Sequence, residues 1–100
     1  MNLDRVFEAL ASGPRRRLLG ALAQGELTTT GLAQRFALTA PAVSRHLSVL
    51  ENAGLVAGRR EGQRVLYALV RDTLMEALAE FAGEFGRQEP PRPKKQREAI

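Results

Sequence analysis

The spacing of apolar residues changes twice along this 100-residue chain, and this restricts the fold more than any other feature of the sequence. Up to Gly54 the apolar residues recur every three or four positions, as on one face of a helix. Val65, Tyr67 and Leu69 then follow at intervals of two, the period of a strand, before the helical spacing returns at Leu74. The pattern predicts one small, mainly helical domain with a single short β-structure.

The residues that interrupt these stripes set the expected element boundaries. Ser12-Gly13-Pro14, Gly25 and Gly54 break or end helices, because glycine and proline favour helix ends. Helices are therefore expected over about residues 3–11, 14–24, 31–36 and 40–53. The residues expected on their inner faces are Leu3, Val6, Phe7, Leu10, Leu18, Leu19, Leu22, Val43, Leu47 and Leu50.

A β-hairpin and a fifth helix complete the predicted order, α-α-α-α-β-β-α. Glu61-Gly62 lies at the turn between two strand-like runs, and glycine is typical of tight hairpin turns. The last helix is expected over about residues 72–86, with an apolar face of Leu74, Leu78, Phe81 and Phe85. Residues 87–100, with three prolines and five basic residues, predict a disordered basic tail after a folded domain of residues 1–86.

Missing residue types exclude several functions. The chain has no cysteine and a single histidine, His46, which excludes disulfides, thiolate metal sites and thiol nucleophiles. No nucleophile and acid accompany His46 as catalysis requires, so a structural or phosphate-contacting role is favoured. We expect no enzyme activity, no cofactor and no bound metal. The first residues lack a signal pattern and no apolar run approaches the ~18–20 residues of a membrane span, so we expect a cytoplasmic protein without membrane contact.

The net charge of +4 is unevenly distributed. The segment from Arg35 to Arg71 carries +4, and a basic segment of this kind favours a nucleic-acid partner. The last helix carries a row of acids, which are Asp72, Glu76, Glu80 and Glu84. This row is most simply a solvated face; the alternative is that it attracts Arg15–Arg17 of a second subunit or the basic tail.

The segment from Thr28 to Gly54 has the arrangement of a helix-turn-helix. Its two short helices are joined by Ala37-Leu38-Thr39, and the second starts with small or hydroxylated residues that fit the major groove of DNA. Arg45 can bind guanine there through two hydrogen bonds. The alternative is a helical hairpin that only builds the core. The residues of this segment predicted to contact DNA are Thr39, Ala40, Ser44, Arg45, His46 and Ser48.

The predicted hairpin favours the DNA interpretation because its turn is rich in arginine. Arg59, Arg60, Gln63 and Arg64 lie at or beside the turn, from which a protruding loop reaches phosphates or a minor groove. The alternative is an edge hairpin that its charges protect from aggregation. Three arginines also open the second helix, where the helix dipole disfavours cations, and Arg16 among them is predicted to contact phosphate.

The order and spacing of these blocks resemble the ArsR-type (ArsR/SmtB) winged helix-turn-helix repressors of bacteria. The similarity covers about residues 6–69 and lies in the blocks ALASGPRRRLL, AVSRHLSVLENAGLV and RREGQRVLYAL. It implies a homodimeric transcriptional repressor that binds an inverted-repeat operator in double-stranded DNA. It also implies dimerisation through the first and last helices, here by Leu3, Val6, Phe7, Leu74, Leu78, Phe81 and Phe85.

The chain departs from the metal-sensing members of that family. The positions that carry cysteines in those members fall on Thr28 and Thr30, and hydroxyls are poor ligands for soft metals. Of the family's second metal site, on the last helix, only Asp72 is retained. We therefore expect no metal sensing, and the inducer is left open between an organic ligand in the dimer crevice, a partner protein and none. Ala40 stands where relatives often have a polar base-reading residue. A winged-helix module that binds protein instead of DNA is the alternative function.

Overall fold

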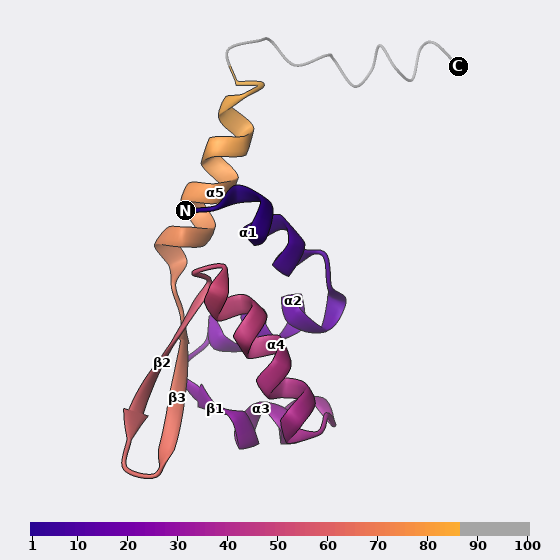
Figure 1. The fold of residues 1–100 in the computed structure, drawn as a ribbon, viewed down its shortest axis with the longest axis vertical. Helices are drawn as coiled ribbons and strands as arrows, with labels where there is room; N and C mark the ends of the chain where they lie inside the picture. Colours follow the sequence, from indigo (N-terminus) through magenta and orange to yellow (C-terminus); the bar gives the residue numbers. More distant parts are fainter. Residues whose placement is uncertain (87–100) are drawn as a thin grey trace, which may run out of the picture.

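A computed structural model describes residues 1–86 as five helices beside a small antiparallel sheet (Figure 1). The tail predicted for residues 87–100 lies outside the described residues. The elements are α1 (Leu3–Leu10), α2 (Gly13–Leu22), β1 (Leu27–Thr28), α3 (Thr29–Phe36), α4 (Ala40–Asn52), β2 (Val56–Glu61), β3 (Arg64–Leu69) and α5 (Arg71–Gly83). The five predicted helices and the predicted hairpin are confirmed, each within a few residues of its expected bounds.

One strand was not predicted. Leu27 and Thr28 form β1, which pairs antiparallel with β3, with Leu27 opposite Tyr67 and Thr28 opposite Leu66. The sheet therefore has three strands in the order β1-β3-β2, and the expected order lacked its third element. A strand of two residues is too short to give a period, so the sequence pattern carried no signal for it.

The helices begin where polar side chains satisfy their free backbone N–H groups. The side-chain oxygens of Asn2, Ser12, Thr28 and Thr39 accept from the backbone N–H three residues further on and begin α1 to α4. In α5 the corresponding position is Val70, whose side chain has no acceptor. Four of the five helix starts are therefore determined by residues that can be recognised in the sequence.

The core lies where α1 to α4 meet the base of the hairpin. Among its most completely buried side chains are those of Leu18, Leu32, Val43, Leu47, Leu50 and Leu55. Val6, on α1, is fully buried as well. We expected Val6 at a dimer surface, and this prediction is wrong, because a side chain covered by its own subunit cannot contact a second one. Leu3 and Leu74, also expected at that surface, pack in part against the core.

Helix α5 contributes little to this core and leaves most of its apolar surface outside. Ala77 is its one buried residue, whereas Leu78 and Phe81 are each 43% exposed, and Phe85, just after the helix, is 60% exposed. The ring of Phe81 packs edge-on against Phe7 of α1 and against Phe85, each at a centroid distance of 5.1 Å. The two terminal helices thus form one exposed apolar face. Within residues 1–86 no helix is long and apolar enough to cross a membrane.

Candidate nucleic-acid interface

The turn between α3 and α4 fixes the position of the second helix. Ala37 ends α3 in the left-handed conformation, with φ 55° and ψ 42°, and its N–H donates to the carbonyl of Ala33. The N–H of Leu38 donates to the same carbonyl at 3.0 Å. Thr39 follows, and its Oγ1 accepts from the N–H of Ala42 at 3.2 Å to begin α4. These bonds give the sharp reversal of a helix-turn-helix, as predicted.

The burial pattern of α4 decides which of its side chains face outward. Val43, Leu47 and Leu50 are buried against the rest of the domain. The side chains on the opposite face are exposed, and all the predicted base-contacting positions of α4 are among them: Ala40, Ser44, Arg45 and Ser48. Pro41 shares this face, four residues before Arg45, and was not included in the prediction. Thr39, just before the helix, is exposed too.

His46 lies at the edge of this face and contacts Arg15 of α2. Its Nδ1 is 3.5 Å from Nη1 of Arg15, and the imidazole is only partly exposed. The same guanidinium donates from Nε to the carbonyl of Ala9 at 2.8 Å and from Nη2 to that of Glu8 at 3.2 Å. Partial burial, followed by the charges of Arg15 and Arg45, lowers the pKa of His46 below its ordinary value.

The arginines that open α2 bind the end of α1. Besides the two bonds from Arg15, Nη1 of Arg16 donates to the carbonyl of Leu10 at 2.6 Å. These bonds satisfy carbonyl groups in the last turn of α1, which has no basic residue of its own. Arg16 lines a cavity together with residues of α1, α2, β3 and α5, and no residue of α4 lines that cavity. Of the three arginines, Arg15 is the one beside α4.

The hairpin divides its arginines between its two faces. Directly paired residues share a face, so Arg59, Glu61 and Arg64 lie on one side and Arg60, opposite Val65, lies on the other. Nη2 of Arg59 is 2.6 Å from Oε1 of Glu26, its Nη1 is 3.2 Å from Oε2 of Glu61, and Nη2 of Arg64 is 3.1 Å from Oε1 of Glu61. Hydrogen bonds from Arg59 and then Arg64 lower the pKa of Glu61. Sequence reasoning treated all three arginines as equivalent and missed these ion pairs.

A polar cavity of about 270 Å³ separates the start of α3 from the tip of the hairpin. The residues that line it are Thr28, Thr29, Thr30, Gln63, Arg64, Val65 and Tyr67. Hydroxyl groups, a side-chain amide and a guanidinium therefore face one space, and these are groups that hydrogen-bond to phosphate oxygens. The predicted contact residue Gln63 lies here, whereas the three threonines were not among the predicted contact residues.

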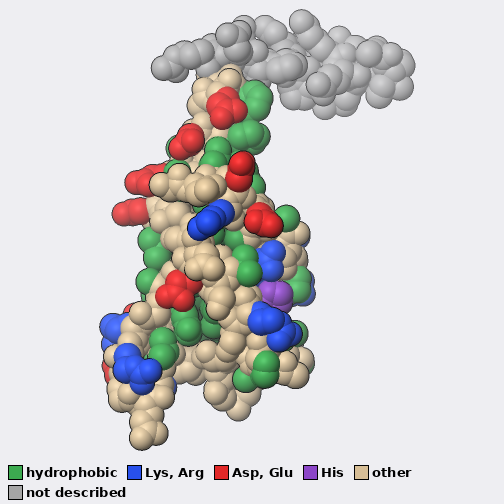
Figure 2. All heavy atoms as spheres, in the orientation of Figure 1, with side chains coloured by type: hydrophobic (Ala, Val, Ile, Leu, Met, Phe, Trp, Pro, Cys, Tyr) green, Lys and Arg blue, Asp and Glu red, His purple; other side chains and the backbone are tan. Residues whose placement is uncertain are grey.

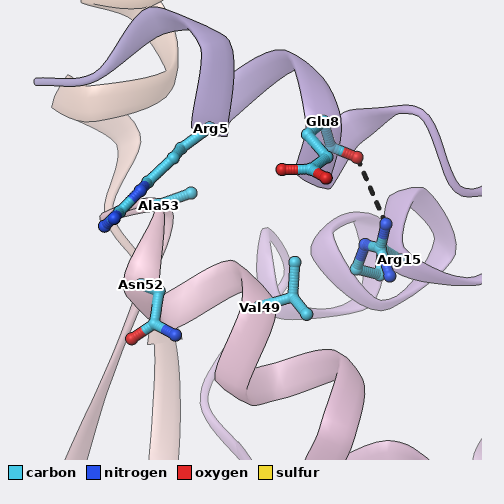
Figure 3. A pocket seen from close by; sticks show the side chains of 6 residues that line it. All are labelled: Arg5, Glu8, Arg15, Val49, Asn52 and Ala53. Atoms are coloured by element: carbon cyan, nitrogen blue, oxygen red, sulfur yellow. Dashed lines mark hydrogen bonds between the residues drawn. The ribbon is translucent and has the colours of Figure 1, made fainter.

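A larger hollow of about 490 Å³ lies between α1 and α4 (Figure 3). Arg5, Glu8 and Arg15 line it from one side, and Val49, Asn52 and Ala53 line it from α4 and the residue after it. On the face shown in Figure 2, arginine side chains gather over the hairpin and beside the histidine, while a row of acidic side chains follows α5. Within residues 1–86 no three His, Cys, Asp or Glu side chains gather in a way that would hold a metal ion.

These features define the class of the protein. A helix-turn-helix whose second helix exposes small, hydroxylated and basic side chains, followed by an arginine-bearing β-hairpin, is a winged helix-turn-helix domain. Residues 12–57 match the model of a family described as "Bacterial regulatory protein, arsR family". The chain is also 30% identical over 76 residues to the transcriptional repressor SdpR of Bacillus subtilis, which covers 76% of this chain and 84% of that protein.

Further relatives agree with that match. The chain is 46% identical over 66 residues to the HTH-type transcriptional regulator Rv2034 of Mycobacterium tuberculosis, which covers 66% of this chain and 62% of that protein. Its fold resembles the solution structure of the homodimeric winged helix-turn-helix DNA-binding domain of Mb0332 from Mycobacterium bovis, with a TM-score of 0.70. The two sequences are 31% identical, and the match covers 89% of this chain and 84% of that chain. The chain belongs to the arsR family of bacterial regulatory proteins. This confirms the expectation of a regulator rather than an enzyme.

Proposed function

We propose that this protein is a homodimeric transcriptional repressor that binds an inverted-repeat operator in double-stranded DNA. One observation carries the proposal: α4 turns its small, hydroxylated and basic residues outward from a buried apolar face, beside a hairpin that bears further arginines. This is the form of a helix that enters the major groove while a wing reaches the flanking backbone. Such a protein acts on the chromosome and is therefore expected in the cytoplasm.

The base contacts are assigned to the exposed face of α4. Arg45 is the one long basic side chain there, and its fork of donors matches the two acceptors of guanine. Ser44 and Ser48 are short enough to let the backbone of the helix approach the base edges. Ala40 supports an apolar contact, for example with a thymine methyl group. Thr39 contacts phosphate at the start of the helix.

The phosphate contacts are assigned to the wing and its neighbours. Arg60 makes no ion pair within the described residues and lies on the face of the sheet that also carries Tyr67 and Val65. Gln63, Arg64 and the threonines at the start of α3 supply further donors around one cavity. Arg59 contributes after exchanging its carboxylate partners for phosphate. These contacts set the register of the protein on the duplex without reading the sequence.

The second subunit is proposed to cover the apolar face of α1 and α5. Leu78, Phe81 and Phe85 leave a large apolar surface in water, while α5 buries only Ala77 in its own subunit. Phe7 of α1 packs against Phe81 and extends this surface. The similar Mb0332 domain is described as homodimeric. A two-fold dimer presents its two recognition helices to half-sites one helical turn apart, about 34–36 Å.

Selection of bound duplexes from a random pool tests this proposal. The dimer is expected to enrich inverted repeats whose half-site centres are about 10 base pairs apart. The variant Phe81→Asp, which disrupts the apolar face, is expected to enrich nothing beyond the starting pool. Enrichment of single, unrepeated sites by both proteins would contradict a dimeric repressor, and absence of enrichment by either would favour the alternative of a protein-binding module.

A further inference from the structure

A further cavity, which no residue of α4 lines, combines an apolar wall with two arginines. It has a volume of about 320 Å³ and lies between α2, the end of β3 and the start of α5. Its apolar lining comes from Leu10, Leu19, Gly20, Ala23, Leu69 and Leu74. Arg16 and Arg71 complete the lining, and none of the eight residues is acidic. An apolar wall with a few placed charges is the usual composition of a small-molecule site.

The two guanidinium groups are held in place by backbone carbonyls. Nη1 of Arg16 donates to the carbonyl of Leu10 at 2.6 Å, and Nη2 of Arg71 donates to the carbonyl of Ala23 at 2.7 Å. Each bond uses one of the five N–H donors of its side chain. Neither arginine forms an ion pair within residues 1–86. Two fixed positive charges with unused donors therefore face a cavity that contains no compensating carboxylate.

The start of α5 adds to the positive potential. Val70 precedes this helix and, unlike the residues that begin α1 to α4, has no side-chain acceptor for the first backbone N–H groups. The cavity is lined at this helix start by Arg71 and Leu74 of α5 and by Leu69, the last residue of β3. Asp72 of the same turn, which is not a lining residue, offsets part of the helix dipole. The guanidinium groups thus supply most of the attraction for an anion.

We propose that this cavity binds an amphipathic organic anion, of the class of aromatic or medium-chain carboxylates. Its carboxylate lies between Arg16 and Arg71, and its apolar body packs against Leu19, Leu69 and Leu74. The larger hollow between α1 and α4 is a poorer site for such a molecule. Arg5, Glu8 and Arg15 bring charges of both signs to it.

The position of the cavity connects ligand binding with DNA binding. Leu69 ends the second strand of the wing, and Arg71 begins the helix that carries most of the proposed dimer face. A ligand between them and α2 changes how α5 packs on the helix-turn-helix half, and hence the spacing of the two recognition helices. This coupling rests on the proposed function, whereas binding of the anion does not.

A titration of the full-length, ¹⁵N-labelled protein with 1-naphthoate tests the site. We expect saturable shifts of the amide signals of Gly20 and residues 69–74, with a Kd on the order of 1 mM or tighter. The neutral analogue 1-naphthalenemethanol is expected to bind at least about tenfold more weakly, because it has no charge for the arginines. Equal affinities for the two compounds, shifts centred elsewhere, or no saturation would overturn the proposal.

Two pairs of variants separate the site from general stability. A Cβ added at Gly20 meets no atom within 4 Å, so this position of the cavity lining has room for a side chain. Gly20→Leu, whose fold is checked by circular dichroism, is expected to occupy the cavity and to weaken naphthoate binding at least about tenfold, while Gly20→Ala binds nearly as wild type. Arg71→Gln is expected to abolish the preference for the acid over the alcohol, and Arg17→Gln, beside the site in sequence, to retain it. Unchanged binding by Gly20→Leu would show that the ligand lies elsewhere.

The effect on DNA is read separately by measuring operator affinity with and without naphthoate. We expect a change of about fivefold or more that is absent in Gly20→Leu. Naphthoate binding without this change overturns the coupling alone. Failure to bind any operator refutes the proposed function. It does not affect the anion site, which the titration tests independently.

Discussion

Arg15 joins the end of α1 to the recognition helix, with its Nη1 3.5 Å from Nδ1 of His46. The same guanidinium donates to the carbonyls of Ala9 and Glu8, so three segments depend on one side chain. Arginine stays protonated and supplies the donor, so His46 accepts at Nδ1, which only a neutral imidazole can do. Partial burial is the main cause of the lowered pKa of His46, and the charge of Arg15 lowers it further.

The first prediction concerns stability below neutral pH. His46 titrates at its ordinary value of 6.5 in the unfolded chain and lower in the folded one. The unfolded chain therefore binds more protons as the pH falls through 6.5, and the free energy of unfolding decreases. Urea denaturation at pH 7.5 and 5.5 is expected to show a larger loss for the wild type than for His46→Gln. Equal losses would mean that the contact with Arg15 has no energetic consequence.

The second prediction concerns Glu61, whose carboxylate forms ion pairs with two arginines of the wing. Glu61 binds both Arg59 and Arg64, and all three side chains are exposed, so these ion pairs exchange easily for phosphate. Glu61→Gln is expected to raise affinity for any duplex about three- to tenfold at 0.1 M salt and to steepen its salt dependence. Glu84→Gln is the control, because it removes the same charge from the end of α5 and not from the wing. Equal affinities and salt dependences for the two variants would show that Glu61 does not restrain the wing arginines.

The third prediction separates the two neighbouring arginines of β2. Arg60 is free of ion pairs within residues 1–86, whereas Arg59 binds Glu26 and Glu61. Arg60→Ala is therefore expected to weaken binding to matched and mismatched duplexes by a similar factor, larger than the factor for Arg59→Ala. Fluorescence anisotropy over a salt series measures both. A larger loss for Arg59→Ala would show that the ion pairs do not restrain that side chain.

The fourth prediction tests the dimer face. A charge at Leu78 or Phe81 is expected to convert the dimer to a folded monomer, because these side chains are exposed in one subunit and contribute little to its core. Sedimentation velocity measures the mass. Val49→Asp places a charge on another exposed apolar residue, on α4, and is expected to leave the mass unchanged. A monomeric wild type, or dimers of Phe81→Asp, would refute this face.

The fifth prediction concerns the turn before the recognition helix. Ala37 has a φ of 55°, a conformation that costs a residue with a Cβ roughly 1–2 kcal/mol. Ala37→Gly is expected to raise the free energy of unfolding by about 0.5–1 kcal/mol, after the larger entropy of glycine in the unfolded chain is subtracted. Gly54→Ala, at φ +80°, is the reverse change and is expected to destabilise. A destabilised Ala37→Gly would contradict this reasoning.

The sequence carried most of the fold because its signals are local. Apolar spacing identified the buried faces of α2 and α4, and small or hydroxylated residues indicated the start of α4. It failed where the decisive contact is not local. The pairing of β1 with β3 joins residues about forty positions apart, and the burial of Val6 depends on how α1 packs on the other helices.

The exposed face of α4 could be predicted from the sequence, but the surroundings of the candidate site could not. Exposure of Arg45 and Ser44 follows from helical spacing once the buried face is known. The pairing of Glu26 with Arg59 depends on the β1-β3-β2 sheet, which the sequence did not predict. Likewise, the arginines that open α2 appeared to have no local partner, because their acceptors are the carbonyls at the end of the preceding helix.

The central claim is that α4 reads a DNA sequence, and one measurement tests it most directly. The ratio of affinities for the selected operator and a scrambled duplex is measured at 0.15 M salt for wild type and Arg45→Ala. A sequence-reading helix predicts a ratio of about 10³ or more for the wild type and a fall of roughly ten- to a hundredfold in the variant. A wild-type ratio near one, or an identical ratio for Arg45→Ala, would contradict the account.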